Sequence, residues 1–100
     1  MGRKPLVFED FADKLEQVFV ISDQNVPAIP LTLAEAELLR TRAGMPGIRP
    51  PFSLVFLGKD PRVLPQRIYH MQHADLGMLE IFLVPIGKDA QGVSYQATFN

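Results

Sequence analysis

A chain of 100 residues, 47% of them hydrophobic, can build one domain around a single core and is too short for two. Its formal net charge of −1 argues against nucleic acid as a partner, because nucleic-acid-binding domains normally carry a basic face. The absence of cysteine excludes disulfides, thiol nucleophiles and thiolate metal sites, and no apolar stretch approaches the roughly 20 residues that cross a bilayer. We therefore expect a cytoplasmic globular domain that binds neither membrane nor nucleic acid.

The first predicted element is an amphipathic helix over residues 7–18. Its apolar residues recur at spacings of three, four and three, which is the helical period. They are Phe8, Phe11, Leu15 and Val18. Glu9 and Asp10 would lie in the first turn, where negative charge favours the helix dipole. We expect this helix to plug one end of a sheet; the functional alternative is a helix that binds a partner.

A β-hairpin is predicted next. Residues 17–22 are β-branched and aromatic, residues 23–27 have turn composition, and residues 28–33 alternate apolar and other residues with the period of a strand. Pro30 restricts the second strand to an edge of the sheet, or to a position where the proline nitrogen faces away from the hydrogen-bond ladder. An edge strand at residues 28–33 could pair with a strand of a partner.

Residues 33–42 admit two interpretations. Thr32 and Glu35 make a capping box, and the residues that follow are good helix formers. The alternation of apolar residues up to Leu33 instead indicates a strand that continues. Residues 43–51 hold two glycines and three prolines, which predicts a loop, and a mobile one.

Four more strands are predicted in the second half of the chain, at residues 52–58, 68–71, 78–84 and 93–99. The first of these is apolar on both faces and should be central. Turns are predicted at residues 59–62, 73–77 and 87–92. Nine prolines divide the chain into short segments, and consecutive strands with short connections pair antiparallel. The sequence therefore predicts a single mainly β domain, a small antiparallel barrel or two-layer sandwich of about six strands with one short N-terminal helix.

Two histidines and an aspartate form the pattern His70-x-x-His73-x-Asp75. On a helix, histidines three residues apart share a face and could bind zinc. On a strand they point to opposite faces, so a metal site would require His73 to turn back within the loop. The simpler interpretation is one surface histidine and one histidine that hydrogen-bonds to the turn. We expect no cofactor.

Other polar side chains fall among apolar strand residues. Tyr69 and Tyr95 should enter the core with their hydroxyls at its rim, and a ligand pocket lined by them is the alternative. Glu80 should point outwards together with Phe82 and Val84, which predicts that the N-terminal helix or a partner covers this face. A catalytic role for Glu80 lacks a second acid or base at a suitable spacing.

Several short motifs resemble those of a small uncharacterised bacterial domain family. They are residues 51–56, 64–66, 82–87 and 95–100, with Tyr69-x-Met71-x-His73 and Leu76-Gly77-x-Leu79. Members of that family have about this length and are often encoded beside genes for phage-tail-collar-like proteins. The family usually has glycine where this chain has Glu16 and Arg67. The resemblance covers most of residues 8–100, favours the strand interpretation of residues 33–38 and supplies no catalytic residues.

These observations predict a non-enzymatic interaction or structural accessory protein whose partner is another protein or a second copy. The resemblance implies a phage-derived or secretion-like apparatus. The candidate binding residues are Gln66, Tyr69 and His73, which we expect to form a surface for a partner. The alternatives are a small-ligand-binding β-barrel and, second, a small metal-dependent enzyme.

Overall fold

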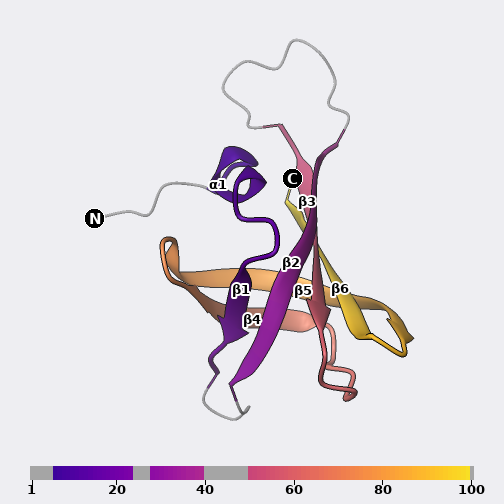
Figure 1. Ribbon diagram of the computed structural model, residues 1–100. Helices are drawn as coiled ribbons and strands as arrows, with labels where there is room; N and C mark the ends of the chain where they lie inside the picture. The colour runs from indigo at the N-terminus through magenta and orange to yellow at the C-terminus, as the bar shows by residue number, and fades with distance from the viewer. Residues whose placement is uncertain (1–5, 24–27, 40–49, 100) are drawn as a thin grey trace.

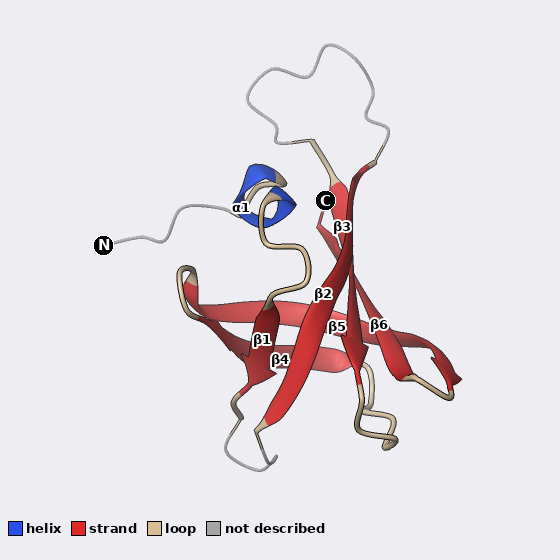
Figure 2. Ribbon diagram, in the orientation of Figure 1, coloured by secondary structure: helices blue, strands red, loops and turns tan. Residues whose placement is uncertain are grey.

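The structure, a computed structural model, describes residues 6–23, 28–39 and 50–99. In this part of the chain a short helix precedes six strands, so the mainly β prediction is confirmed (Figures 1 and 2). The elements are α1 (Glu9–Ala12), β1 (Val18–Ile21), β2 (Ile29–Leu38), β3 (Phe52–Gly58), β4 (Arg67–His73), β5 (Gly77–Asp89) and β6 (Gly92–Phe99). Among the described residues, no helix is long and apolar enough to cross a membrane.

The strands form a closed barrel in the order β1-β2-β3-β6-β5-β4, and every neighbouring pair is antiparallel. The ring closes where β1 meets β4, with Val20 opposite Gln72 and Ile21 opposite Met71. Figure 1 shows β4 and β5 running across the hairpin of β1 and β2. Of the two predicted architectures, the structure is therefore the barrel. The strand β3 lies between β2 and β6, which confirms its predicted central position.

Alternate residues of each strand point into the barrel and fill it. This is the expected consequence of side chains that alternate between the two faces of a pleated strand. The buried apolar residues are Phe11, Phe19, Ile21, Ile29, Leu31, Leu33, Phe52, Leu54, Phe56, Tyr69, Met71, Leu79, Ile81, Leu83, Val93, Tyr95 and Ala97. Such a core can hold the fold together without a disulfide or a metal.

The N-terminal helix is much shorter than predicted. It ends at Ala12 rather than Val18, and the side chains of Leu15 and Val18 are 45% and 50% exposed. The chain must turn into β1 after one helical turn, and Glu16 makes this turn with a φ of 69° while its amide donates to the Leu33 carbonyl oxygen. The tertiary pairing of β1 thus overrides the helical period of the sequence.

The predicted plugging role of the helix is confirmed. Phe11 is fully buried, and its ring centroid lies 5.8 Å from that of Phe52 and 5.9 Å from that of Phe99. The ring of Phe11 also stacks on Phe19 at 6.1 Å. Aromatic pairs at such separations are favourable beyond the area they bury. The single turn of helix is therefore held by one side chain in the end of the barrel.

The helix interpretation of residues 33–42 is wrong for the described part of that range, because β2 continues to Leu38. Leu33 is fully buried, and β2 pairs with β3 from Thr32 to Leu38 with a bulge between Leu33 and Glu35. Pairing along a whole neighbouring strand outweighs a local capping box. Residues 40–49, which hold most of the predicted loop at 43–51, lie outside the described residues.

The strand β2 is not an edge, since it pairs with β1 on one side and β3 on the other. Thr32 and Leu33 are therefore not available to a partner's strand, whereas among the described residues β3 pairs with none before Thr32, so pairing of residues 28–31 with a partner's strand stays a prediction. Pro30 is tolerated because its nitrogen faces away from the hydrogen-bond ladder, which was the second of the two predicted possibilities. The Leu33 amide donates to the Gln17 carbonyl oxygen of the chain leading into β1 at 3.0 Å. Backbone nitrogens of a strand point alternately to its two sides, so the nitrogen of Pro30, three residues earlier, faces away from β1. On that side the pairs with β3 begin only at Thr32.

The strand β5 is longer than predicted and shortens the expected turn at residues 87–92 to Ala90 and Gln91. A bulge between Pro85 and Gly87 lets the strand continue beyond a residue that has no amide hydrogen. Gly92 opens β6 with a φ of 138°, and a Cβ there would lie 2.0 Å from the Gly58 carbonyl oxygen. Only glycine fits this close approach of two strands.

The second end of the barrel is closed by the segment between β3 and β4, which lies opposite α1 (Figure 1). The Tyr69 hydroxyl donates to the Pro65 carbonyl oxygen. The Tyr95 hydroxyl accepts from the Leu64 amide at 3.0 Å and donates to the Arg62 carbonyl oxygen at 3.4 Å. Both tyrosines are buried with satisfied hydroxyls at the rim of the core, as predicted.

Candidate functional site

The strand β4 divides the two histidines between the inside and the outside of the barrel. His73 is buried and shares the inner face with Tyr69 and Met71, whereas His70 lies on the outer face with its side chain 51% exposed. The predicted separation of the two rings is confirmed. Among the described residues, no group of three or more histidine, aspartate or glutamate side chains is placed to hold a metal ion.

His73 holds the turn between β4 and β5, as the simpler interpretation of the histidine motif predicted. Its Nδ1 atom accepts hydrogen bonds from the amides of Asp75 at 3.1 Å and Leu76 at 3.2 Å. Because Nδ1 accepts, Nε2 carries the ring hydrogen and donates it to Gln17 Oε1 at 2.6 Å. The ring also stacks on Phe19 with centroids 4.4 Å apart. Both nitrogens are thus occupied by structural contacts.

The predicted surface around Gln66, Tyr69 and His73 does not exist as one surface. The side chains of Tyr69 and His73 are 1% and 5% exposed, and only Gln66 is exposed. The strand period explains this result, because the inner face of β4 carries both rings into the core. Residues of β4 that can meet a partner are the alternate ones.

The outer face of the β4–β5 hairpin carries three rows of cross-strand pairs. Ile68 lies opposite Phe82, His70 opposite Glu80 and Gln72 opposite Met78, and all six side chains are exposed. We call these six residues the hairpin face. Its apolar members are bulky: Ile68 is 57% exposed, Phe82 45% and Met78 37%. Two of them form one row, so their exposed areas adjoin.

Asp23, two residues after the end of β1, holds the side chain of His70 on the hairpin face. Asp23 Oδ1 accepts from the backbone amide of His70 at 3.3 Å and lies 2.7 Å from its Nδ1. The second carboxylate oxygen lies 3.6 Å from Nη2 of Arg67. Since an ionised carboxylate only accepts, Nδ1 carries a hydrogen and the ring is held with Nε2 available to a partner. No local sequence pattern predicts this cluster, because Asp23 resembles an ordinary turn residue and lies 47 positions from His70.

The N-terminal helix does not cover the hairpin face. Its buried residue, Phe11, packs at the end of the barrel, and Phe82 keeps 45% of its surface exposed. Of the two covers predicted for the face of Glu80 and Phe82, the helix is therefore wrong. Cover by a partner stays a prediction.

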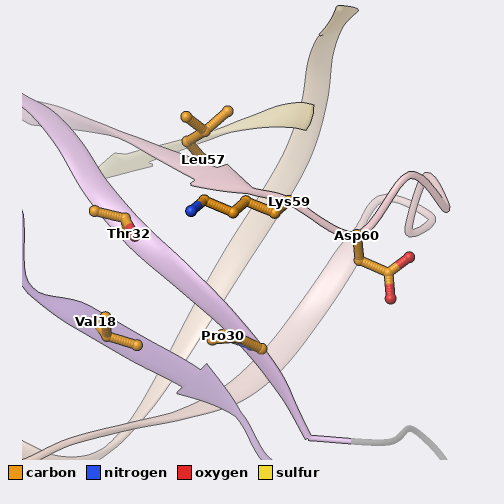
Figure 3. Close-up of a pocket in the computed structure, with 6 residues that line it drawn as sticks. All are labelled: Val18, Pro30, Thr32, Leu57, Lys59 and Asp60. Carbon is orange, nitrogen blue, oxygen red and sulfur yellow. The ribbon is translucent and has the colours of Figure 1, made fainter. Parts of the chain in front are cut away.

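Among the residues that the structure describes, two hollows can be placed on the outside of the barrel. One of about 240 Å³ lies over β1, β2 and β3 and is lined by Val18, Pro30, Thr32, Leu57, Lys59 and Asp60. Figure 3 shows Lys59 extending across it towards Thr32, whereas the Asp60 carboxylate points away. The other, of about 540 Å³, is lined by Val18, Val20, Gln72, His73, Ala74 and Gly77. A ligand-binding barrel usually encloses its ligand, whereas both of these hollows lie outside the barrel, so the small-ligand alternative stays a prediction.

Comparison with known proteins adds a family to this fold. No curated protein and no solved structure matches the chain. A family model described as a domain of unknown function, DUF6916, matches residues 6–99. The resemblance to an uncharacterised domain family is therefore confirmed at that level. Because the match extends over almost the whole chain, the protein belongs to the DUF6916 family.

Proposed function

We propose that this protein is a non-enzymatic interaction or structural accessory protein that binds a protein partner through the hairpin face. One observation carries the proposal. Ile68 and Phe82 face each other across two paired strands and remain 57% and 45% exposed, although the barrel has a complete core of its own. Bulky apolar side chains that adjoin on a regular sheet are typical of a surface that a partner covers.

The energetics of the hairpin face suit such a contact. Complete burial of an isoleucine or phenylalanine side chain is worth about 1.5–3 kcal/mol, so covering the half that remains exposed contributes about 1 kcal/mol for each. Strands that are already ordered lose little conformational entropy when they bind. His70 and Glu80 lie beside the apolar row, where polar groups favour the correct partner more than they add affinity.

The biological setting follows from the sequence resemblance. It supports a bacterial protein of a phage-derived or secretion-like apparatus, and the absence of cysteine is compatible with a reducing cytoplasm. In such an apparatus a small rigid barrel would act by contact, as a subunit or an assembly factor. This part of the proposal depends on the resemblance, and the hairpin face supplies the surface.

The test is affinity purification of the tagged chain from its native host, with mass spectrometry of the retained proteins. Three baits are compared: the unaltered chain, Phe82→Ser, and the control Leu38→Ser. Leu38 is 49% exposed and lies on β2, which neighbours neither β4 nor β5. We expect the partner to be retained by the unaltered chain and by Leu38→Ser, and lost by Phe82→Ser. Equal retention by all three baits would contradict the proposal.

A further inference from the structure

We infer that the occupant of the hairpin face is a second copy of this chain. The two copies would be related by a two-fold axis that lies in the plane of contact, parallel to the strands and over the line midway between β4 and β5. The inference rests on the proposed function, because it names the partner of the same face. Homodimers with two-fold symmetry use the same patch on both subunits, so the patch must be complementary to itself. The hairpin face can be examined for this property residue by residue.

A two-fold axis in that position places each strand of the hairpin over the other strand of the second copy. Each residue then lies over the residue that is its cross-strand neighbour within its own chain. The pairs given by the register are Ile68 with Phe82, His70 with Glu80, and Gln72 with Met78. Sheets packed face to face in this way keep their strands roughly aligned, about 10 Å apart.

Each of these pairs joins unlike and compatible side chains. Ile68 of one copy would cover Phe82 of the other, and the two-fold axis repeats the contact, so four exposed apolar side chains meet in one cluster on the axis. The row of His70 and Glu80 borders this cluster on one side, and polar groups beside an apolar cluster are usual in protein interfaces.

Charge adds a second argument. Glu80 forms no ion pair within the described part of the chain, and its cross-strand neighbour His70 is directed instead to Asp23 at 2.7 Å. In the dimer, Glu80 of each copy would lie over His70 of the other, whose Nε2 is the nitrogen that Asp23 leaves available. This contact is complementary when the imidazole carries both ring hydrogens, because Nδ1 then donates to Asp23 and Nε2 donates to the Glu80 carboxylate of the other copy.

The alternative axis, perpendicular to the strands through the row of His70 and Glu80, is disfavoured by the same residues. It would place Glu80 over Glu80 and His70 over His70 of the second copy, and would separate Ile68 from Phe82. The two Glu80 carboxylates would then repel each other across the contact. The charge pattern thus selects the axis parallel to the strands.

Sedimentation equilibrium and native mass spectrometry of the full chain test the inference with two variants, Ile68→Glu and Phe82→Lys. We expect the unaltered chain to be a dimer and each variant alone to be a monomer. In an equimolar mixture, Glu at position 68 of one variant faces Lys at position 82 of the other, and the second contact remains Ile68 on Phe82. The mixture should form a heterodimer at least about tenfold tighter than either variant's self-association.

The control is Leu38→Glu, which places a charge at a similarly exposed position of β2 and should leave the dimer intact. Far-UV circular dichroism verifies that each variant is folded. A monomeric unaltered chain up to its solubility limit would overturn the inference, and so would a dimer that persists in Ile68→Glu. A monomer would not by itself overturn the proposed function, which fails only if Phe82→Ser retains every protein that the unaltered chain binds.

Discussion

Replacement of His73 tests how much of the barrel's stability depends on one buried ring. Three hydrogen bonds end on this side chain, to the amides of Asp75 and Leu76 and to Gln17 Oε1, and the ring stacks on Phe19 at 4.4 Å. A typical hydrogen bond contributes about 0.5–1.5 kcal/mol net and an aromatic stack about 0.5–1.5 kcal/mol. Because Asp75 and Gln17 are exposed, water replaces part of what is lost.

We therefore expect His73→Ala to lower the free energy of unfolding by about 3 kcal/mol. In a domain of this size that corresponds to a fall of about 12–24 °C in the midpoint of thermal unfolding. Two further variants divide the loss. His73→Phe keeps a ring beside Phe19 and loses all three hydrogen bonds, whereas His73→Asn keeps an acceptor close to the place of Nδ1 and loses the stack. Each should lose about 2 kcal/mol.

Urea unfolding followed by far-UV circular dichroism measures these differences, since the chain has no tryptophan. The control is Gln17→Ala combined with each variant, because the Gln17 contact should contribute only where Nε2 is present. If His73→Phe were as stable as the unaltered chain, the hydrogen bonds to the turn would contribute nothing, and the role assigned to His73 would be refuted.

Three more outcomes are expected. Glu16→Gly should stabilise the fold by about 0.5–1 kcal/mol in urea unfolding, because glycine adopts a φ of 69° without the cost of a left-handed residue; no gain would contradict the strain. Tyr69→Phe should cost about 1–2 kcal/mol by removing the bond to the Pro65 carbonyl oxygen. Burial raises the pKa of Tyr69, so its contribution is full below the ordinary value of 10.0 and is lost as pH rises above it; the variant should be less sensitive to alkali. The hydrogen bond from Arg62 lowers the pKa of Asp60 from 3.8 to about 2. The contribution of this pair to the free energy of unfolding is therefore present above pH 3.8 and lost as pH falls towards 2. An NMR titration of Asp60 should have its midpoint near 2 in the unaltered chain and return towards 3.8 in Arg62→Ala.

The strands could be predicted because most of them are apolar at alternate positions and end at turn residues. Phe52–Gly58 was predicted to the residue, since a run that is apolar on both faces can only be central. The errors lie where tertiary pairing competes with local preference. Residues 33–38 contain good helix formers and a capping box, yet pairing with β3 and burial of Leu33 make them a strand.

The glycine expected by the family pattern at position 16 has a physical explanation in the structure. Among the described residues, Glu16 is the non-glycine residue with positive φ, and it lies at the turn between α1 and β1. A helical period that continued to Val18 would have required an ordinary helical φ there. The position where the family usually has glycine and this chain has Glu16 is therefore the position where the helix cannot continue.

The candidate site was less predictable than the fold. The sequence indicates the strand that carries the proposed hairpin face, but the residues that it suggests there, Tyr69 and His73, belong to the buried face. Aromatic and imidazole side chains attract functional interpretations, whereas the outward Ile68 resembles any core residue until the register places it opposite Phe82. The contribution of Asp23 arises from the closure of β1 on β4, a contact between distant segments that no local pattern reports.

The buried and exposed faces of β4 nevertheless depend on each other. Strand side chains alternate, so a shift of one residue in the pairing of β4 with β5 would bring Ile68 and His70 inwards and expose Tyr69 and His73. The turn between β4 and β5 fixes this register, and His73 stabilises the turn because its Nδ1 atom accepts hydrogen bonds from two turn amides. Any variant that loosens this turn should weaken contacts made by the hairpin face without touching it. The buried contacts of His73 and the exposed hairpin face therefore both depend on the same strand register.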